Sequence, residues 1–256
     1  MITNSFSDIT LQMNIKIIYE TDNYLVISKP MGIAVYPGAD RKSYTVRDWL
    51  CDKYPEILKH NWKSKDRVGV IHRLDKDTSG VMLLAKNPAT LDHFQDQFRK
   101  RKVNKFYLSL VYGKLKSKHN IIYGLISADP KNRKAQKIQM IDFGLDKRER
   151  KTAGTEYWAK QDFLYDKQPL SLLEVKILTG RKHQIRAHLK HEGYPVIGDP
   201  TYTTKPAKRL SKKLGIARQF LHAYKIKIID PGGKWVTFED DLPDDLQKIL
   251  NKINVV

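Results

Sequence analysis

A polar nine-residue segment joined to an apolar run constrains this 256-residue chain more than any other feature. Segment 72–80, HRLDKDTSG, places the Asp75 carboxylate between the cations Arg73 and Lys76, and the apolar run 81–85, VMLLA, follows it directly. A short apolar run bounded by turn residues is typical of a buried strand. The carboxylate is therefore expected on a loop anchored to the core, where its position can be held for chemistry.

The composition points to a polyanionic partner. Lys and Arg number 47 against 28 Asp and Glu, which gives a formal net charge of +19 at pH 7. A surplus of this size favours salt-dependent binding to polyanions. Nucleic acid is the first candidate and an anionic membrane surface the second, while a bias toward lysine for solubility is the alternative that needs no partner.

The sequence lacks the features of a secreted or membrane-spanning protein. Its one cysteine, Cys51, excludes a disulfide framework and a multi-cysteine zinc site, and it suits a reducing compartment. No apolar run approaches the roughly 20 residues of a membrane helix. Residues 1–14 lack the pattern of a signal peptide and are predicted to form a short disordered lead. We therefore expect a cytoplasmic protein with no membrane attachment.

Periodicity and turn residues predict more strands than helices. Alternating or apolar runs predict strands at 15–28 (two strands around Asp22-Asn23), 81–85, 105–113, 155–161, 170–178, 224–229 and 234–238. Capping residues and breakers predict helices after Thr45, after Asn87, before Gly193 and after Pro243. Because the helices do not alternate one-for-one with the strands, an α+β fold with a mixed, mainly antiparallel central sheet flanked by helices and loops is favoured.

Three basic stretches lie between these elements. Segment 59–67 is expected to be an exposed loop. Residues 127–153 are predicted to form a long loop or insertion with a short strand near 135–140, and 205–218 is a further basic segment.

Five segments, spread over most of the chain, form an ordered set of signatures. They are ETDNYLVISKPMGIAVYPG at 20–38, HRLDKDTSG with VMLLAK at 72–86, NKFYLSLVYGKL at 104–115, LTGRKHQIRAHLKHEGYPVIGDPTY at 178–202, and RQFLHAYKIKIIDPGG with FEDDLP at 218–243. In this order they closely resemble the RluA-type pseudouridine synthases, within the RluA/RsuA family of RNA pseudouridine synthases. The resemblance implies the pseudouridine synthase fold over 15–256, as a single catalytic domain without the accessory RNA-binding domain that many members carry before it.

The resemblance also implies an activity and a partner. The activity is isomerisation of specific uridines in structured ribosomal or transfer RNA to pseudouridine: the N-glycosidic bond breaks, the uracil rotates, and carbon 5 rejoins the ribose. No cofactor and no metal are implied. RNA is the partner, no obligate protein partner is implied, and a monomer is sufficient.

By their match to the family motifs, seven residues become candidates for the site. The catalytic candidates are Asp75, Tyr107 and Arg186, and the candidates for RNA or base binding are Arg73, Ile185, Arg181 and His72. Asp75 would be the catalytic carboxylate and Arg73 would fill the space left by the flipped uridine. Tyr107 would stack on the base and assist proton removal. Arg186 would pair with Asp75, and Ile185 would pack on the uracil.

Elementary chemistry agrees with these roles. A uracil inside structured RNA must leave its stack to react, and a planar guanidinium can occupy the gap. A nearby arginine favours the ionised form of a reacting carboxylate, and a tyrosine ring offers a flat face to a base. Holding the detached uracil against the sugar makes the rejoining step intramolecular, worth about 7–11 kcal/mol at best.

Other interpretations of the same residues remain open. The scaffold could be a catalytically inactive RNA-binding or RNA-chaperone protein. A carboxylate glycosidase would need a second positioned acid, for which only Asp77 and Asp199 are candidates. His72 is interpreted as a hydrogen-bonded neighbour of the loop rather than a proton carrier, and Asp77 as a loop cap. Lys29 could contact phosphate or only solvent.

Three histidines in the 178–202 segment invite a metal hypothesis. His188 and His191 share a helical face, and His183 precedes them. No adjacent carboxylate or cysteine completes a ligand set, so no metal is expected.

Overall fold

The chain divides into two compact units that are each built from separated stretches of sequence. The computed structural model describes residues 15–38, 43–130, 132–140 and 152–256. Unit 1 comprises Met1–Val103 and Lys225–Asp240, and unit 2 comprises Asn104–Tyr224 and Asp241–Val256. The predicted disordered lead at 1–14 lies outside the described residues. A single catalytic domain over 15–256 stays a prediction.

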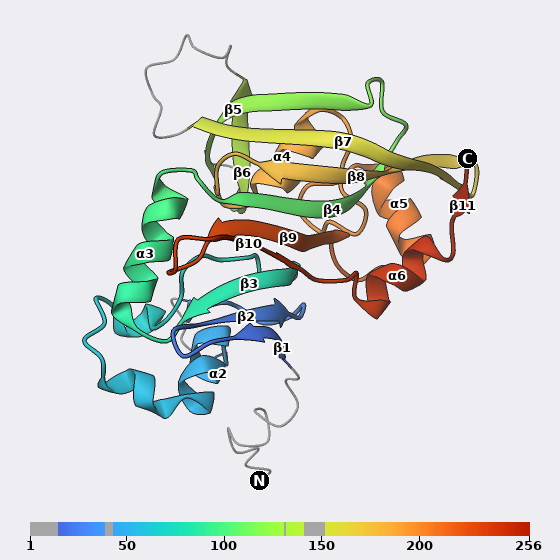
Figure 1. The fold of residues 1–256 in the computed structure, drawn as a ribbon. Coiled ribbons are helices and arrows are strands. Elements are labelled where there is room, and N and C mark those ends of the chain that lie inside the picture. The colour runs from blue at the N-terminus through green and yellow to red at the C-terminus, as the bar shows by residue number, and fades with distance from the viewer. Residues whose placement is uncertain (1–14, 39–42, 131, 141–151) are drawn as a thin grey trace. The chain divides into compact units, whose positions relative to one another are not determined.

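Unit 1 combines antiparallel strands with two α-helices and two short 3-10 helices among its described residues (Figure 1). Its elements are β1 (Lys16–Glu20), β2 (Tyr24–Lys29), α2 (Val46–Lys53), the short helices η1 (Pro55–Lys59) and η2 (Lys65–Arg67), β3 (Ser79–Ala85), α3 (Pro88–Arg99) and β10 (Trp235–Glu239). Strand β2 pairs with β1 and β3, and β10 pairs with the last residues of β9 (Leu221–Ile229), all antiparallel. The predicted strands at 15–28, 81–85 and 234–238 are confirmed.

Strand β3 is buried along its whole length because both of its faces are covered. Met82 and Leu84 belong to one hydrophobic cluster, together with Leu50 of α2. Leu83 belongs to a second cluster, which contains Phe94 of α3. Successive side chains of a strand point to opposite faces, so alternate residues of β3 enter the two clusters. The strand that follows segment 72–80 is thereby fixed from both sides.

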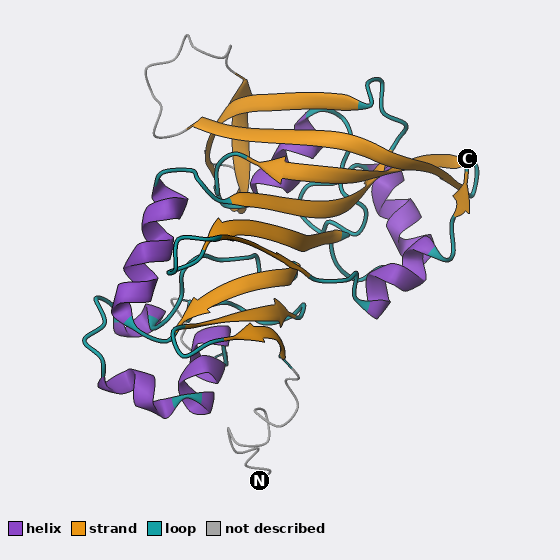
Figure 2. Ribbon diagram, in the orientation of Figure 1, coloured by secondary structure: helices purple, strands orange, loops and turns teal. Residues whose placement is uncertain are grey.

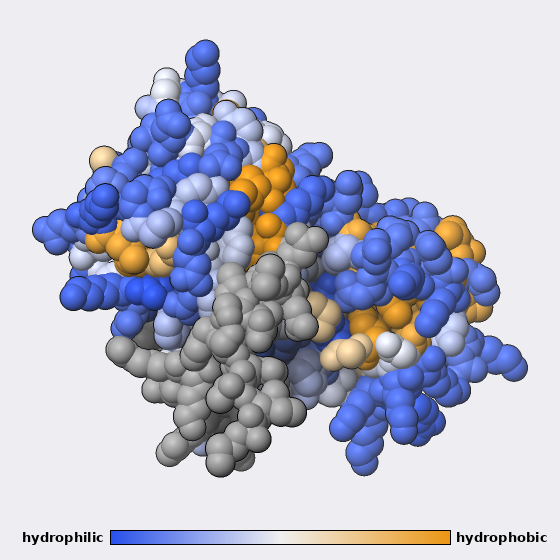
Figure 3. Space-filling view, turned by 90° about the horizontal axis from the view of Figure 1, so that it is seen from below, coloured by the Kyte–Doolittle hydropathy of each residue, from blue (hydrophilic) through white to orange (hydrophobic). Residues whose placement is uncertain are grey.

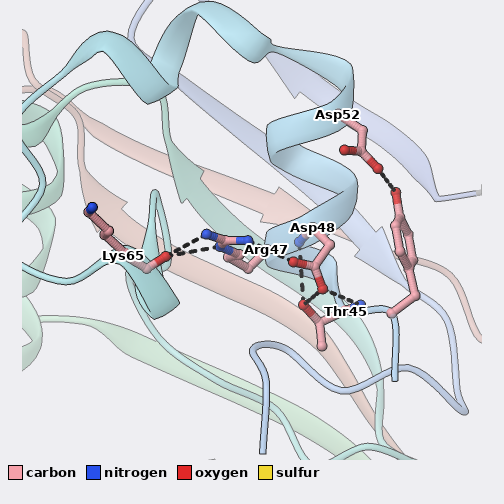
Figure 4. A network of polar contacts seen from close by, with 6 residues as sticks. Thr45, Arg47, Asp48, Asp52 and Lys65 are labelled. Carbon is pink, nitrogen blue, oxygen red and sulfur yellow. Dashed lines mark hydrogen bonds and ion pairs between the residues drawn. The ribbon is translucent and has the colours of Figure 1, made fainter. Parts of the chain in front are cut away.

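The start of α2 is secured by a capping box, as expected from Thr45 (Figure 4). The Thr45 hydroxyl accepts the backbone N–H of Asp48, and the Asp48 carboxylate accepts the backbone N–H of Thr45 at 3.0 Å. Arg47 donates to Asp48 at 2.8 Å and to the Lys65 carbonyl at 2.6 Å. The bond from Arg47 to Lys65 ties segment 59–67 to the first turn of the helix. This segment is largely exposed and contains η2.

Unit 2 contains the longer run of neighbouring antiparallel strands (Figure 2). Its elements are β4 (Asn104–Tyr112), β5 (His119–Asp129), β6 (Asn132–Met140), β7 (Thr152–Tyr165), β8 (Gln168–Ile177), α4 (Gln184–His191), α5 (Lys205–Leu214), α6 (Asp244–Leu250) and β11 (Asn254–Val255). The strand order is β4-β8-β7-β5-β6, with β11 on β7, and every one of these pairs is antiparallel. The predicted α+β fold with a mainly antiparallel sheet is confirmed.

Two regions of unit 2 differ from the sequence prediction. Residues 132–140 form the full strand β6, longer than the short strand expected, and β5 was not predicted. Strand β6 is the last strand in the order, and backbone pairing with β5 supports it although its residues are mostly polar. The basic segment at 205–218 contains helix α5, whose inward residues Ala207, Leu210 and Leu214 are buried. Residues 141–151 of the predicted loop lie outside the described residues.

Candidate active site

Segment 72–80 leads into β3 and contains both buried and exposed side chains. Leu74 and Thr78 are buried, Asp75 is half-buried, and Arg73 is exposed. The Thr78 N–H donates to the Asp75 carbonyl at 3.1 Å, which closes a turn around the residues between them. The carboxylate-bearing residue is therefore flanked by two anchors, as a loop that positions chemistry requires.

Lys29, at the end of β2, holds this loop by a hydrogen bond to its backbone. Its side chain is fully buried, and its ammonium donates to the carbonyls of Pro30 at 2.7 Å, Ile33 at 3.0 Å and Lys76 at 3.0 Å. The Gly32 N–H donates to the same Lys76 carbonyl. The interpretation of Lys29 as a phosphate or solvent contact was wrong, because the side chain is buried. Lysine usually stays in water, and hydrogen bonds to these carbonyls, one of them 47 residues further along the chain, offset the cost of burying its charge.

His72 connects the start of the loop to β3 and α3. Its Nε2 accepts the backbone N–H of Leu83 at 3.1 Å, and its ring stacks on Phe98 with centroids 4.9 Å apart. An accepting Nε2 carries no proton, so the contacts agree with the expected structural neighbour. Its assignment to RNA binding stays a prediction.

Arg73 lies against an aromatic ring that the sequence interpretation missed. Its Nη1 donates to the Tyr36 hydroxyl at 2.5 Å, and its guanidinium carbon lies 5.0 Å from the Tyr36 ring centroid. The Arg67 guanidinium carbon lies 4.7 Å from the same ring. The exposed guanidinium of Arg73 is thus oriented by a cation–π contact, which is weak enough to exchange for another flat partner.

In unit 2, Tyr107 occupies a buried position in the middle of the sheet. It lies on β4 opposite Val175 of β8 and is 7% exposed. Lys105 precedes it by two residues, on the same face of the strand. Burial lowers the pKa of Lys105 to about 8. Its Nζ lies 3.9 Å from the position that a Cβ on Gly180 would occupy, which places this cation, not predicted as a site residue, beside segment 179–183.

Gln184 locks segment 179–183 to the sheet. Its amide oxygen accepts the Thr179 hydroxyl at 2.6 Å and the Arg181 N–H at 3.0 Å. Its amide nitrogen donates to the Gly154 carbonyl at 2.8 Å and the Thr155 hydroxyl at 3.0 Å. Helix α4 starts at this residue, so the predicted site residues Ile185 and Arg186 follow on a fixed first turn, both buried, while Arg181 is exposed.

Arg186 forms a buried, bidentate ion pair with Asp199. Its Nε and Nη2 donate to the two carboxylate oxygens at 2.6 and 3.0 Å, and the side chains are 5% and 0% exposed. Asp199 also accepts the N–H groups of Thr201 and Tyr202, each at 2.8 Å. The Arg186 guanidinium carbon lies 5.2 Å from the Tyr202 ring centroid. Asp199 therefore orients the arginine, a role that was not predicted for it.

The candidates thus fall into two groups that the structure describes separately. His72, Arg73 and Asp75 share the loop of unit 1, while the remaining candidates, Tyr107, Arg181, Ile185 and Arg186, belong to unit 2. The predicted pairing of Arg186 with Asp75 connects the two units and stays a prediction.

His188 of α4 and His183, which precedes the helix, each have a local partner. His188 is buried, its Nδ1 lies 2.8 Å from the Thr155 hydroxyl, and burial lowers its pKa to about 4. His183 Nδ1 lies 3.1 Å from the Tyr202 hydroxyl.

Within the described ranges, no group of three or more His, Cys, Asp or Glu side chains could hold a metal ion. No helix in those ranges has the length and apolarity needed to cross a membrane. The face drawn in Figure 3 is mainly hydrophilic, with small hydrophobic patches.

Comparison with known proteins gives this architecture a family. Residues 23–191 match the family model of RNA pseudouridylate synthase. An uncharacterized RNA pseudouridine synthase of Aquifex aeolicus is 36% identical over 93% of this chain and 72% of its own length. Ribosomal large subunit pseudouridine synthase D of Borreliella burgdorferi is 38% identical over 84% of this chain and 61% of its own length. Human RNA pseudouridylate synthase domain containing 1 superposes with a TM-score of 0.72 at 25% identity, covering 95% of this chain and 89% of that chain.

These matches define the class as isomerases that act on RNA. The chain belongs to the RNA pseudouridylate synthase family, and the resemblance to its RluA-type members is confirmed.

Proposed function

We propose that this protein isomerises specific uridines in structured RNA to pseudouridine, with Asp75 as the essential carboxylate and without a cofactor. The observation that carries the proposal is the fixed, half-buried position of Asp75 between buried residues, on a loop held by Lys29. Ribosomal RNA is the first substrate class, because the relatives from Borreliella burgdorferi and Nitrosomonas europaea are named as ribosomal large subunit enzymes. Transfer RNA is the second.

The proposed reaction conserves atoms and electrons within one nucleotide. The bond between N1 of uracil and the ribose breaks, the base rotates, and C5 forms the new bond to the same ribose carbon. The proton lost from C5 is matched by one gained at N1. Asp75 acts on the reacting nucleotide as an ionised carboxylate, and Tyr107 stacks on the base and assists removal of the C5 proton.

Arg73 is proposed to enter the RNA stack in place of the flipped uridine. Its exposed guanidinium already lies on the Tyr36 ring, and a base plane or a vacated stack offers an equivalent flat contact. Filling the gap lowers the cost of unstacking, which is a few kcal/mol for one base.

Arg186 is proposed to pair with Asp75 in the working enzyme. The bidentate contact with Asp199 holds its guanidinium rigidly, so a further contact costs little side-chain entropy. Ile185 would pack on the uracil, and Arg181 and His72 would support RNA binding. We also propose that a monomer suffices and that the protein works in the cytoplasm, in keeping with the single, buried thiol of Cys51.

Pseudouridine mapping tests the proposal directly. RNA is isolated with and without the protein present, and the purified wild type is compared with Asp75→Asn and with Asp77→Asn, a matched change two residues further along the same loop. We expect Asp75→Asn to abolish pseudouridine formation while fold and RNA affinity persist, and Asp77→Asn to retain activity. RNA binding by the wild type without any pseudouridine would favour an inactive RNA-binding or chaperone protein instead.

A further inference from the structure

A hollow of about 550 Å³ lies in unit 2 between helix α5 and the turn that carries Asp199. Gly198, Asp199 and Pro200 line one side, and polar or charged residues of α5 line the other. The two walls are joined, because the Ser211 hydroxyl of α5 accepts the Gly198 N–H at 2.8 Å. The hollow is therefore a built feature of the unit rather than a space between mobile side chains.

Helix α5 turns a row of cations toward this hollow. Lys205, Lys208, Arg209 and Lys212 all line it and are exposed, at spacings that place them on one side of a helix. The row extends about 10 Å along the helix axis. A ligand with several negative charges can contact more than one of them at once.

These four cations differ from their neighbours in their ion pairing. Within the residues that the structure describes, none of the four side chains forms an ion pair. By contrast, Lys213 pairs with Asp166, and Arg218 pairs with Asp245 at 2.7 Å. The same region therefore contains both neutralised and unneutralised cations, and the unneutralised ones are those around the hollow.

Asp199, the one acid among the described residues of the lining, does not cancel their charge. The Asp199 side chain is fully buried, and its oxygens accept two hydrogen bonds from Arg186 and two from backbone N–H groups. Arg186 already balances it. A concave surface with this surplus of positive charge concentrates anions.

The backbone of α5 is fixed before any ligand arrives. Thr204 caps its first turn, and Ala207, Leu210 and Leu214 are buried beneath it. The cations therefore extend from a rigid base, so binding orders only their side chains. Such preorganisation lowers the entropic cost of recognition.

We propose that this hollow is a phosphate subsite for the RNA backbone; this rests on the proposed function and deepens it. Lysines suit phosphate as flexible point charges. Among the residues that the structure places around the hollow, none is aromatic, so it offers no platform for a base. The contact is sequence-independent and positions the RNA strand next to Asp199 and hence to Arg186.

A salt titration of RNA affinity with charge-matched variants tests the subsite. The full-length protein with Lys205→Gln, Lys208→Gln and Lys212→Gln is compared with Lys16→Gln, Lys59→Gln and Lys248→Gln, which remove the same charge at exposed sites elsewhere. The probe is a synthetic RNA stem–loop. We expect the slope of log affinity against log salt to fall by about 2 to 3 in the first variant and by less than about 1 in the second. Equal slopes in the two variants would overturn the subsite.

Lysine labelling of the wild-type protein gives a readout that does not depend on a variant folding. We expect RNA to protect Lys205, Lys208 and Lys212 from acylation, and to leave Lys248 reactive. Unchanged labelling, or protection by phosphatidylserine vesicles and not by RNA, would overturn the subsite. Pseudouridine formation is measured in parallel: its absence in the wild type contradicts the proposed function, while normal formation without protection contradicts the subsite alone.

Discussion

The ammonium of Lys29 donates to the carbonyl oxygen of Lys76, the residue directly after Asp75, over 3.0 Å. The Gly32 N–H donates to the same oxygen, so two groups from one turn hold a single point of the candidate catalytic loop. A buried ammonium is costly unless it is fully hydrogen-bonded, and three carbonyls meet that condition here. The loop geometry and the burial of Lys29 therefore depend on each other.

Replacing Lys29 should lower both stability and activity. In Lys29→Met, the three carbonyls lose the ammonium donor, although the Gly32 N–H still reaches the Lys76 carbonyl. We expect the free energy of unfolding to fall by about 3 kcal/mol. Urea denaturation measures this loss. Pseudouridine formation, assayed where the variant is still folded, should drop as well because the loop around Asp75 loosens. The exposed control Lys63→Met, which breaks only the surface pair with Asp92, should cost less than about 1 kcal/mol. Full activity in folded Lys29→Met would contradict the positioning role.

Variants of the Arg186–Asp199 pair should change stability and pseudouridine formation independently. Asp199→Leu leaves a buried guanidinium without its carboxylate, and we expect a loss of about 3–5 kcal/mol in the free energy of unfolding. Adding Arg186→Met removes that charge and should restore much of the stability. Pseudouridine formation should be absent in the double variant, because Arg186 is gone. Restored stability together with wild-type pseudouridine formation in the double variant would show that the pair is only structural.

Local sequence patterns predicted helices and strands well where a single capping residue or a short apolar run determines the element. Thr45 and Asn87 accept backbone N–H groups at the starts of α2 and α3, as their side-chain oxygens predict. The apolar run at 81–85 forms the buried strand β3. Helix α5 was missed because a row of lysines and arginine hides a short apolar face, and β6 because backbone pairing with β5 compensates for its polar side chains.

The partners of the candidate site residues could not be predicted in the same way. Lys29 reaches the loop 47 residues further along the chain, and Gln184 reaches back 30 residues to Gly154. Both contacts exist only after the sheets have formed, and a polar residue type by itself predicts exposure. Asp199 was weighed only as a second acid, because its distance from Arg186 is a property of the fold.

His188 should make the stability of the protein fall in mild acid. The ring is fully buried and its Nδ1 faces the Thr155 hydroxyl. Its Nε2 has no hydrogen-bond partner among the residues that the structure describes. Burial, with a smaller contribution from the charge of His191, lowers its pKa to about 4 from an ordinary value of 6.5. Between these two values the unfolded chain binds the proton and the folded protein does not, so the free energy of unfolding decreases as the pH falls. The expected loss is about 3 kcal/mol once the pH is below about 4.

Urea denaturation of the wild type and His188→Gln, from about pH 7 to about pH 4, measures this loss. The carboxylates of the two proteins titrate alike, so the difference between their free energies of unfolding should shrink as the pH falls. The exposed control His60→Gln should follow the wild-type curve throughout, and parallel curves for His188→Gln and the wild type would show that His188 is not the titrating group.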